Sequence, residues 1–167
     1  MKIVRRKKVF ETNSSSCHSI SIYGKPDYDV NISTDKYGNI TVKLDEYGWN
    51  GDPLDDFYSK LAYAISIVLH TEYPGFKQYD SDFYVDDDTL RECPGYQAII
   101  DCIRQVKNCE GILIKRKDND FYPYGYIDHQ SYENYKCFQD FLDDYGIDLY
   151  RFLFDYNIGV NIDNDNH

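Results

Sequence analysis

The sequence predicts one α+β domain over residues 1–167, with a mostly antiparallel sheet and three to four helices. The N-terminal part alternates polar with apolar residues, as half-buried strands do. Apolar residues at helical spacing first occur after residue 52, and from there helices and strands are mixed. No repeat, linker or low-complexity stretch divides the chain, and its 42% of hydrophobic residues suit one buried core.

The first strands are predicted from this alternation. Residues 3–10 form a strand with a basic middle, and residues 17–23 form a half-buried strand. Residues 30–33 and 40–44 flank the turn-forming pair Gly38-Asn39, a pattern typical of a β-hairpin.

The longer helices are predicted from their apolar spacing and their end signals. Asp52-Pro53 begins the first helix, because Asp caps free amides and Pro fits the first helical position. Tyr73-Pro74-Gly75 ends that helix. A second helix covers residues 94–107, and a third covers residues 132–145 and ends at the C-terminal cap Gly146.

The remaining elements are short. Residues 111–116 form a strand, residues 118–120 its turn, and residues 121–127 a returning edge strand. Asp148 caps a short helix that ends at Phe154. A last strand is predicted over the alternating residues Ile158, Val160 and Ile162, before the polar tail 163–167.

The charge of the chain is strongly asymmetric. It carries 18 basic and 29 acidic side chains, a net charge of −11, and five of the basic ones lie in a basic arm, residues 1–8. An acidic body attracts basic protein surfaces and repels nucleic acid, which disfavours direct DNA binding, although solubility alone explains the same charge. Asp86, Asp87 and Asp88 are predicted to form a solvated acidic loop, available to a basic partner.

Tyrosine is unusually abundant, with 18 Tyr beside nine Phe. A Tyr side chain buries a ring and keeps a hydroxyl for a partner, which suits half-exposed surfaces and interfaces. An AT-rich genome is the alternative explanation for this composition.

The five cysteines are widely spaced and lack zinc-binding spacing, so reduced thiols in a cytoplasm are expected. No apolar run is long enough for a signal peptide or a membrane span. The acidic stretches lack the ligand spacing of a calcium loop, and neither a metal nor a cofactor is predicted. His70, at the end of an apolar helix, is predicted to be structural.

A first candidate site is the polar segment that precedes residue 19. Thr12, Asn13, Ser14, Ser15 and Ser16 gather small hydroxyl and amide side chains, and His18 follows them. Such a segment can be a turn that satisfies its own backbone. Alternatively, it cradles a phosphate, a carboxylate or a peptide group, and His18 supplies a proton or a hydrogen bond near neutral pH.

A second candidate site is the segment with Asp128, His129 and Ser131, where a predicted strand leads into a helix. Asp128 or Ser131 can cap that helix. Alternatively, His129 oriented by Asp128 is a general base or a metal ligand, and Ser131 belongs with residues 12–16 to the groups that bind an anion or a partner. If folding brings His18 and His129 together, they form an acid–base pair.

Phe10-Glu11-Thr12-Asn13-Ser14-Ser15-Ser16, followed by His18, resembles the opening of a group of small proteins from bacteriophages, prophages and mobile elements. The segments 126–131 and 161–165 are similar to later segments of that group, and Cys17 stands where such proteins often have another small residue. The intervening two-thirds is not covered. The resemblance implies a phage-type origin and a host bacterial cytoplasm. Small acidic phage proteins rich in Tyr are frequently inhibitors of host defence, with anti-CRISPR proteins as the best-known instance.

Two functions and a plainer alternative follow. In the first, the protein inhibits a host nuclease that handles nucleic acid, such as a type II CRISPR effector or its ribonucleoprotein, through an acidic, Tyr-rich surface. In the second, it is a small enzyme on RNA or a nucleotide phosphate, in which Ser14, Ser15 and Ser16 bind the anion and the two histidines transfer protons. In the third, it is a structural or regulatory phage protein whose serine segment is a rigid turn.

Overall fold

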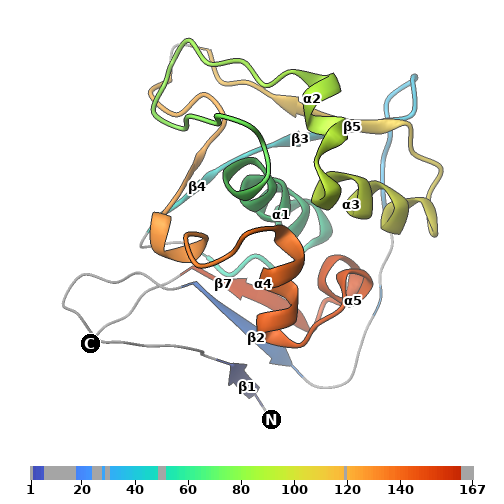
Figure 1. Cartoon of the computed structure of the whole chain (residues 1–167). Coiled ribbons are helices and arrows are strands. Elements are labelled where there is room, and N and C mark those ends of the chain that lie inside the picture. The colour runs from blue at the N-terminus through green and yellow to red at the C-terminus, as the bar shows by residue number, and fades with distance from the viewer. Residues whose placement is uncertain are drawn as a thin grey trace.

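The computed structural model of the chain describes residues 2–5, 18–23, 28, 31–48, 52–118 and 120–162. These residues form an α+β fold, which confirms the predicted class. Helix α1 (Phe57–Thr71) lies in the middle, with α3 (Pro94–Arg104), α4 (Phe138–Tyr145) and α5 (Leu149–Phe154) around it (Figure 1). The short elements α2 (Asp87–Glu92) and the 3-10 turn η1 (His129–Ser131) complete the described helices.

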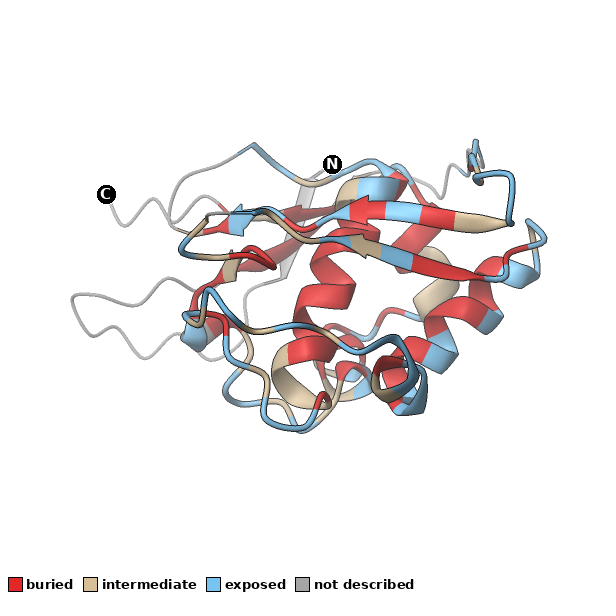
Figure 2. Cartoon of the chain, turned by 90° about the horizontal axis from the view of Figure 1, so that it is seen from above, coloured by how far each residue is buried: buried red, intermediate tan, exposed pale blue. Residues whose placement is uncertain are grey.

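Helix α1 is buried on nearly every side. Eleven of its 15 residues are buried, and the buried colour follows it along its length in Figure 2. The helix begins later than the predicted start at Asp52-Pro53, because the backbone of Leu54 is paired with Val160 by two hydrogen bonds of 2.8 Å. The N-terminal cap is therefore Asp56, whose carboxylate accepts hydrogen bonds from the amides of Tyr58 and Ser59.

One sheet is antiparallel, as predicted. Its strand order is β1 (Lys2–Arg5), β2 (Ser19–Tyr23) and β7 (Ile158–Asn161), so strands from both ends of the chain share one sheet, with β2 between them. In its register Val4 pairs with Ser21, and Ser21 pairs with Gly159.

Two further strand pairs are parallel. Strand β3 (Asn39–Lys43) pairs with β5 (Gly111–Lys115), and β4 (Glu46–Tyr47) pairs with β6 (Tyr126–Ile127). The predicted hairpin is therefore wrong. Residues 31–34 belong to no strand, and Asp35 forms a local turn in which its carboxylate accepts hydrogen bonds from the amides of Tyr37 and Asn39.

The predicted returning strand is shorter than expected. The chain does turn back after β5, where the amide of Lys117 donates to the carbonyl of Pro123 over 2.8 Å, but only residues 126–127 form a strand, paired with β4. Gly125 allows this entry into β6. Its φ is +73°, and a Cβ there would lie 2.3 Å from the carbonyl oxygen of Asp45.

Helix starts differ from the sequence prediction where a distant residue provides the cap. Cys93 and Cys137 precede α3 and α4 and give no side-chain cap. Instead, the Glu72 carboxylate accepts hydrogen bonds from the amide of Gly95 at 2.6 Å and from that of Phe138 at 2.9 Å. Helix α4 therefore begins at Phe138, not near residue 132. The other end signals are confirmed: Gly146 has φ +63° after α4, and the Asp148 carboxylate accepts from the amide of Arg151 in α5.

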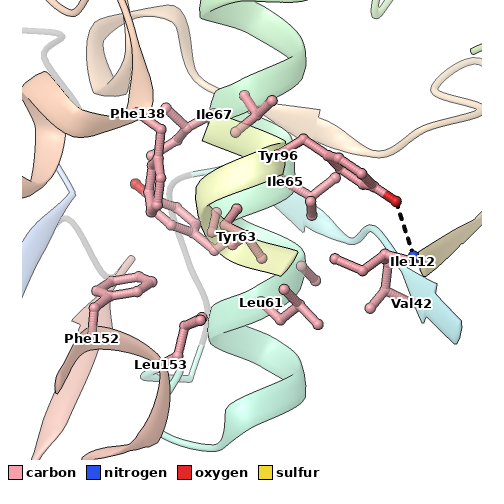
Figure 3. Packing of buried hydrophobic residues seen from close by; sticks show 14 of the residues in the cluster. Val42, Leu61, Tyr63, Ile65, Ile67, Tyr96, Ile112, Phe138, Phe152 and Leu153 are labelled. Carbon is pink, nitrogen blue, oxygen red and sulfur yellow. Dashed lines mark hydrogen bonds between the residues drawn. The ribbon is translucent and has the colours of Figure 1, made fainter. Parts of the chain in front are cut away.

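The core is packed on two sides of α1. Figure 3 shows the rings of Tyr63, Phe138 and Phe152 on one side and Val42 and Ile112 on the other. Across the second side, the amide of Ile112 donates to the Tyr96 hydroxyl over 3.0 Å (Figure 3). Among the described residues, no helix has the length and apolar character needed to cross a membrane.

Candidate functional site

His18 immediately precedes β2 and is only 6% exposed. Its Nε2 lies 3.1 Å from the carbonyl oxygen of Gly48, and its Nδ1 lies 3.0 Å from the hydroxyl of Tyr63. Because a carbonyl only accepts, Nε2 carries the hydrogen, and Nδ1 of the neutral ring accepts from the tyrosine hydroxyl. The carbonyl of His18 accepts a further hydrogen bond from the hydroxyl of Tyr145 at 2.9 Å.

The imidazole of His18 is neutral near pH 7. Burial lowers its pKa, and this effect exceeds the opposing effects of the Gly48 carbonyl and the Asp128 carboxylate. Since both ring nitrogens already have partners, His18 holds the start of β2 against α1 and the end of β4. As placed, it has no nitrogen free to take a proton from a substrate.

Asp128 and His129 follow β6 at the edge where this strand and β4 both end. The two strands are parallel, so Gly48 and Asp128 come to the same edge, and the amide of Asp128 donates to the carbonyl of Tyr47 over 3.2 Å. The Asp128 carboxylate is buried, whereas the His129 side chain is 61% exposed. The Nδ1 of His129 lies 3.5 Å from Oδ1 of Asp128.

The predicted capping role of Asp128 and Ser131 is wrong, because η1 is a single turn and Glu72 caps the following helix. Ser131 is buried, and its Oγ has no hydrogen-bond partner among the described residues.

Asp128 is a shared neighbour of His18 and His129, which brings the two predicted sites to one corner of the fold. The acid–base pair stays a hypothesis, with one imidazole buried and the other exposed. Thr12, Asn13, Ser14, Ser15 and Ser16 lie outside the described residues.

Two loops adjoin on another part of the surface, as Figure 1 shows for the segments before α2 and after β5. They are residues 74–86 and 116–126. Arg116 joins them: its Nε donates to the carbonyl of Phe83 over 3.4 Å, Nη2 donates to the carbonyl of Ser81, and its guanidinium lies 4.3 Å from the ring centre of Tyr84. A further hydrogen bond runs from the amide of Val85 to the hydroxyl of Tyr124.

Four aromatic rings gather where these loops meet. Neighbouring ring centres are 5.0–6.2 Å apart, mostly edge to face. Two of the rings are strongly exposed, Tyr79 at 56% and Phe121 at 62%, and they contact each other, as exposed apolar side chains at binding surfaces do. We call this group the aromatic cluster; it consists of Tyr79, Phe121, Tyr122 and Tyr126.

The same region is acidic. Residues 74–88 and 116–126 carry seven acidic and three basic side chains, and we call them together the acidic aromatic face. Asp86, Asp87 and Asp88 are all exposed. The loop that the sequence predicted for them is wrong. Asp86 caps α2 by accepting from the amide of Thr89. Asp87 and Asp88 occupy the first turn of α2, where the helix dipole favours negative charge.

The three basic side chains of this face all have acidic neighbours. Arg116 lies 2.9 Å from Asp118, and Lys77 lies 3.9 Å from Asp80. Lys117 lies 3.9 Å from Glu46 on β4. The surplus charge of the face therefore comes from exposed carboxylates, with Asp86, Asp87 and Asp88 the densest group.

Sequence reasoning missed Tyr63 and Gly48 as partners of His18, and it missed the gathering of the aromatic cluster. The only available signal was the density of Tyr and Phe in residues 121–126. In the part of the chain that the structure describes, no three His, Cys, Asp or Glu side chains are grouped as metal ligands. No family model, curated protein or solved structure matches the chain.

Proposed function

We propose that the chain is a phage or mobile-element counter-defence protein. It binds a host nuclease that handles nucleic acid, with a type II CRISPR effector as the candidate target, and blocks it with the acidic aromatic face. The observation that carries this proposal is the combination, on two adjoining loops, of exposed aromatic rings with a surplus of carboxylates. The resemblance of residues 10–18 to phage proteins supports the origin.

The face has the chemistry that a nucleic-acid channel recognises. Such a channel presents Lys and Arg to phosphates, and carboxylates can occupy those contacts. The opposite charges also raise the association rate, because an anionic protein is steered toward a basic cleft. The rings of Tyr79 and Phe121 then supply contact area that loses water on binding.

The test is a cleavage assay with the candidate nuclease and the triple variant Asp86→Asn/Asp87→Asn/Asp88→Asn. Asn also caps helices, so α2 is expected to persist while three charges are lost. We expect about a tenfold weaker inhibition.

The matched control is Asp52→Asn/Asp101→Asn/Asp143→Asn, which removes three exposed charges elsewhere. It should inhibit almost as well as the natural protein. Equal inhibition by both triple variants, or equal loss in both, contradicts a role for this face.

A second candidate function, an enzyme on RNA or a nucleotide phosphate, is favoured by one observation. The exposed His129 imidazole stands beside the buried Asp128 carboxylate, two residues before Ser131, whose Oγ has no hydrogen-bond partner in the part of the chain that the structure describes. Such a dyad supplies a general base. Turnover of an RNA or nucleotide substrate that is lost in His129→Asn, with nuclease inhibition unchanged in that variant, would support this function instead.

A further inference from the structure

A cavity of about 420 Å³ opens beside the aromatic cluster. Its walls come from three segments: the end of α1, the loop after it, and the residue that follows η1. The ring centres of His70 and Tyr132 are 4.3 Å apart, and those of His70 and Phe76 are 4.8 Å apart. The side chains that matter here are His70, Phe76, Lys77, Tyr79, Asp80 and Tyr132.

The imidazole of His70, in the wall of this cavity, is held in place. Nδ1 of His70 lies 2.7 Å from the carbonyl oxygen of Ser66, and Nε2 lies 2.7 Å from Oε1 of Gln78. Oε1 of Gln78 accepts from the amide of Ile127, the last residue of β6 and the neighbour of Asp128. Both ring nitrogens of His70 lie against protein oxygen atoms, and burial lowers the pKa of the imidazole, so His70 lines the cavity as an uncharged aromatic ring beside Phe76. The cavity therefore recognises a ligand through the faces of aromatic rings.

The charges around the cavity favour a cation. Asp80 and Lys77 both line it. Oδ2 of Asp80 lies 3.9 Å from the Lys77 ammonium, whose side chain is 68% exposed, and Oδ1 accepts from the amide of Asp82. Behind the wall, burial raises the pKa of the Tyr132 hydroxyl, and the carboxylates of Asp128 and Glu133 raise it further. A phosphate or carboxylate ligand would meet these same carboxylates and be repelled.

We infer that this cavity binds the guanidinium group of an arginine that the partner protein presents. A guanidinium is planar and weakly hydrated, stacks on aromatic faces, and forms two parallel hydrogen bonds with one carboxylate. In this cavity the guanidinium stacks on the rings of Phe76 and Tyr132. The carboxylate of Asp80 pairs with the incoming arginine in place of Lys77. The inference rests on the proposed function, because Tyr79 belongs both to the cavity and to the acidic aromatic face, so a basic partner would bring its arginines to this position.

The cavity can be tested without a partner. NMR titration of the whole chain with Nα-acetyl-arginine amide should shift the ring signals of Phe76, Tyr79 and Tyr132. The lysine analogue should bind about tenfold more weakly, because its ammonium is more strongly hydrated and does not stack. The citrulline analogue, which has the same shape without the charge, should give no shift. A parallel titration with adenosine monophosphate tests whether the cavity binds a nucleotide instead.

Two variants locate the binding. Asp80→Asn keeps the acceptor for the amide of Asp82 and removes only the charge, and Tyr132→Leu replaces a ring by an apolar side chain of related size. Each should weaken binding of the arginine probe about tenfold. Asp82→Asn, an exposed neighbour, is the matched control and should bind normally.

The outcomes separate this inference from the proposed function. Binding of the arginine probe without any nuclease inhibition would contradict the proposed function alone. Nuclease inhibition that survives in Asp80→Asn and Tyr132→Leu, with no shift on adding the arginine probe, would overturn the inference alone. Shifts caused by adenosine monophosphate but not by the arginine probe would also overturn it.

Discussion

At the scale of single residues, the most unusual side chain is Lys60, which is 1% exposed inside the central helix. Its ammonium donates to the carbonyl of Asp155 at 2.7 Å and to that of Ile158 at 3.1 Å, so it joins α1 to the turn before β7. Burial lowers the pKa of Lys60 to about 8, although the Asp155 carboxylate acts in the opposite direction. The lysine connects two distant segments, but keeping it charged in the core destabilises the fold at neutral pH.

This lowered pKa predicts how stability depends on alkaline pH. Between about 8 and the ordinary value of 10.5, the unfolded chain keeps a proton on Lys60 that the folded chain has lost. Stability therefore rises with pH in this window, by about 3 kcal/mol for this group. Urea denaturation from pH 7 to 10.5 should show this rise in the natural protein relative to Lys60→Met.

The comparison with Lys60→Met is needed because other groups titrate nearby. Burial raises the pKa of the Cys93 and Cys102 thiols to about 11, which lowers stability as the pH rises, equally in both proteins. The difference between the two curves isolates the lysine. A difference that does not change from pH 7 to 10.5 would show that Lys60 keeps an ordinary pKa in the fold.

At the scale of elements, one carboxylate organises three helices. Glu72 follows the last turn of α1, and its two oxygens accept from the first amides of α3 and α4. Both contacts place negative charge at the positive end of a helix. Gly95 is required for this approach, since a Cβ at that position would lie 2.6 Å from Oε1 of Glu72.

Replacing this carboxylate should loosen both helix starts. In Glu72→Gln one oxygen becomes an amide group, which cannot accept, so either Gly95 or Phe138 loses its partner and the charge is gone. We expect a loss of about 2 kcal/mol in the free energy of unfolding, measured as a lower urea midpoint with an unchanged slope. Glu92→Gln, at an exposed position of α2, is the control and should change stability little. Equal midpoints for the two variants would contradict the double-cap role.

At the scale of the whole molecule, charge and aromatic surface coincide. The chain has a net charge of −11, and the acidic aromatic face presents exposed rings within that negative field. A partner that binds this face is attracted from a distance by charge and held at short range by ring contacts. The two contributions respond differently to salt, because ions screen the first and leave the second almost unchanged.

The proposed function therefore predicts affinity that falls with salt. Between roughly 0.05 and 0.5 M NaCl the dissociation constant for the nuclease should rise about tenfold or more. The Asp86→Asn/Asp87→Asn/Asp88→Asn variant should show a shallower dependence, since fewer charges remain to be screened. Calorimetry at several salt concentrations measures both. An affinity that is independent of salt would mean that steering by the acidic surface plays no part.

The sequence predicted the elements whose signals are local. The α+β class, the buried character of α1, the cap of α5 by Asp148 and the end of α4 at Gly146 all follow from neighbouring residues. The errors at the starts of α1 and α4 have one cause. The sequence predicts Leu54 in a helix, but Leu54 pairs with Val160. It also predicts residues 132–137 in a helix, but Glu72, 66 residues before Phe138, determines where that helix begins. Local propensity gave way there to a partner that lies far along the chain.

The same division holds for the candidate sites. The sequence alone determined which chemistry is available: an acidic chain rich in Tyr, a His18 after a serine segment, and an Asp128–His129 pair. Only the tertiary structure decided that both nitrogens of His18 are occupied, and that Tyr79 and Phe121 meet beside a cavity. Residue types and spacings are set by the chain itself, whereas burial and long-range pairing depend on which segments pack together to remove apolar surface from water.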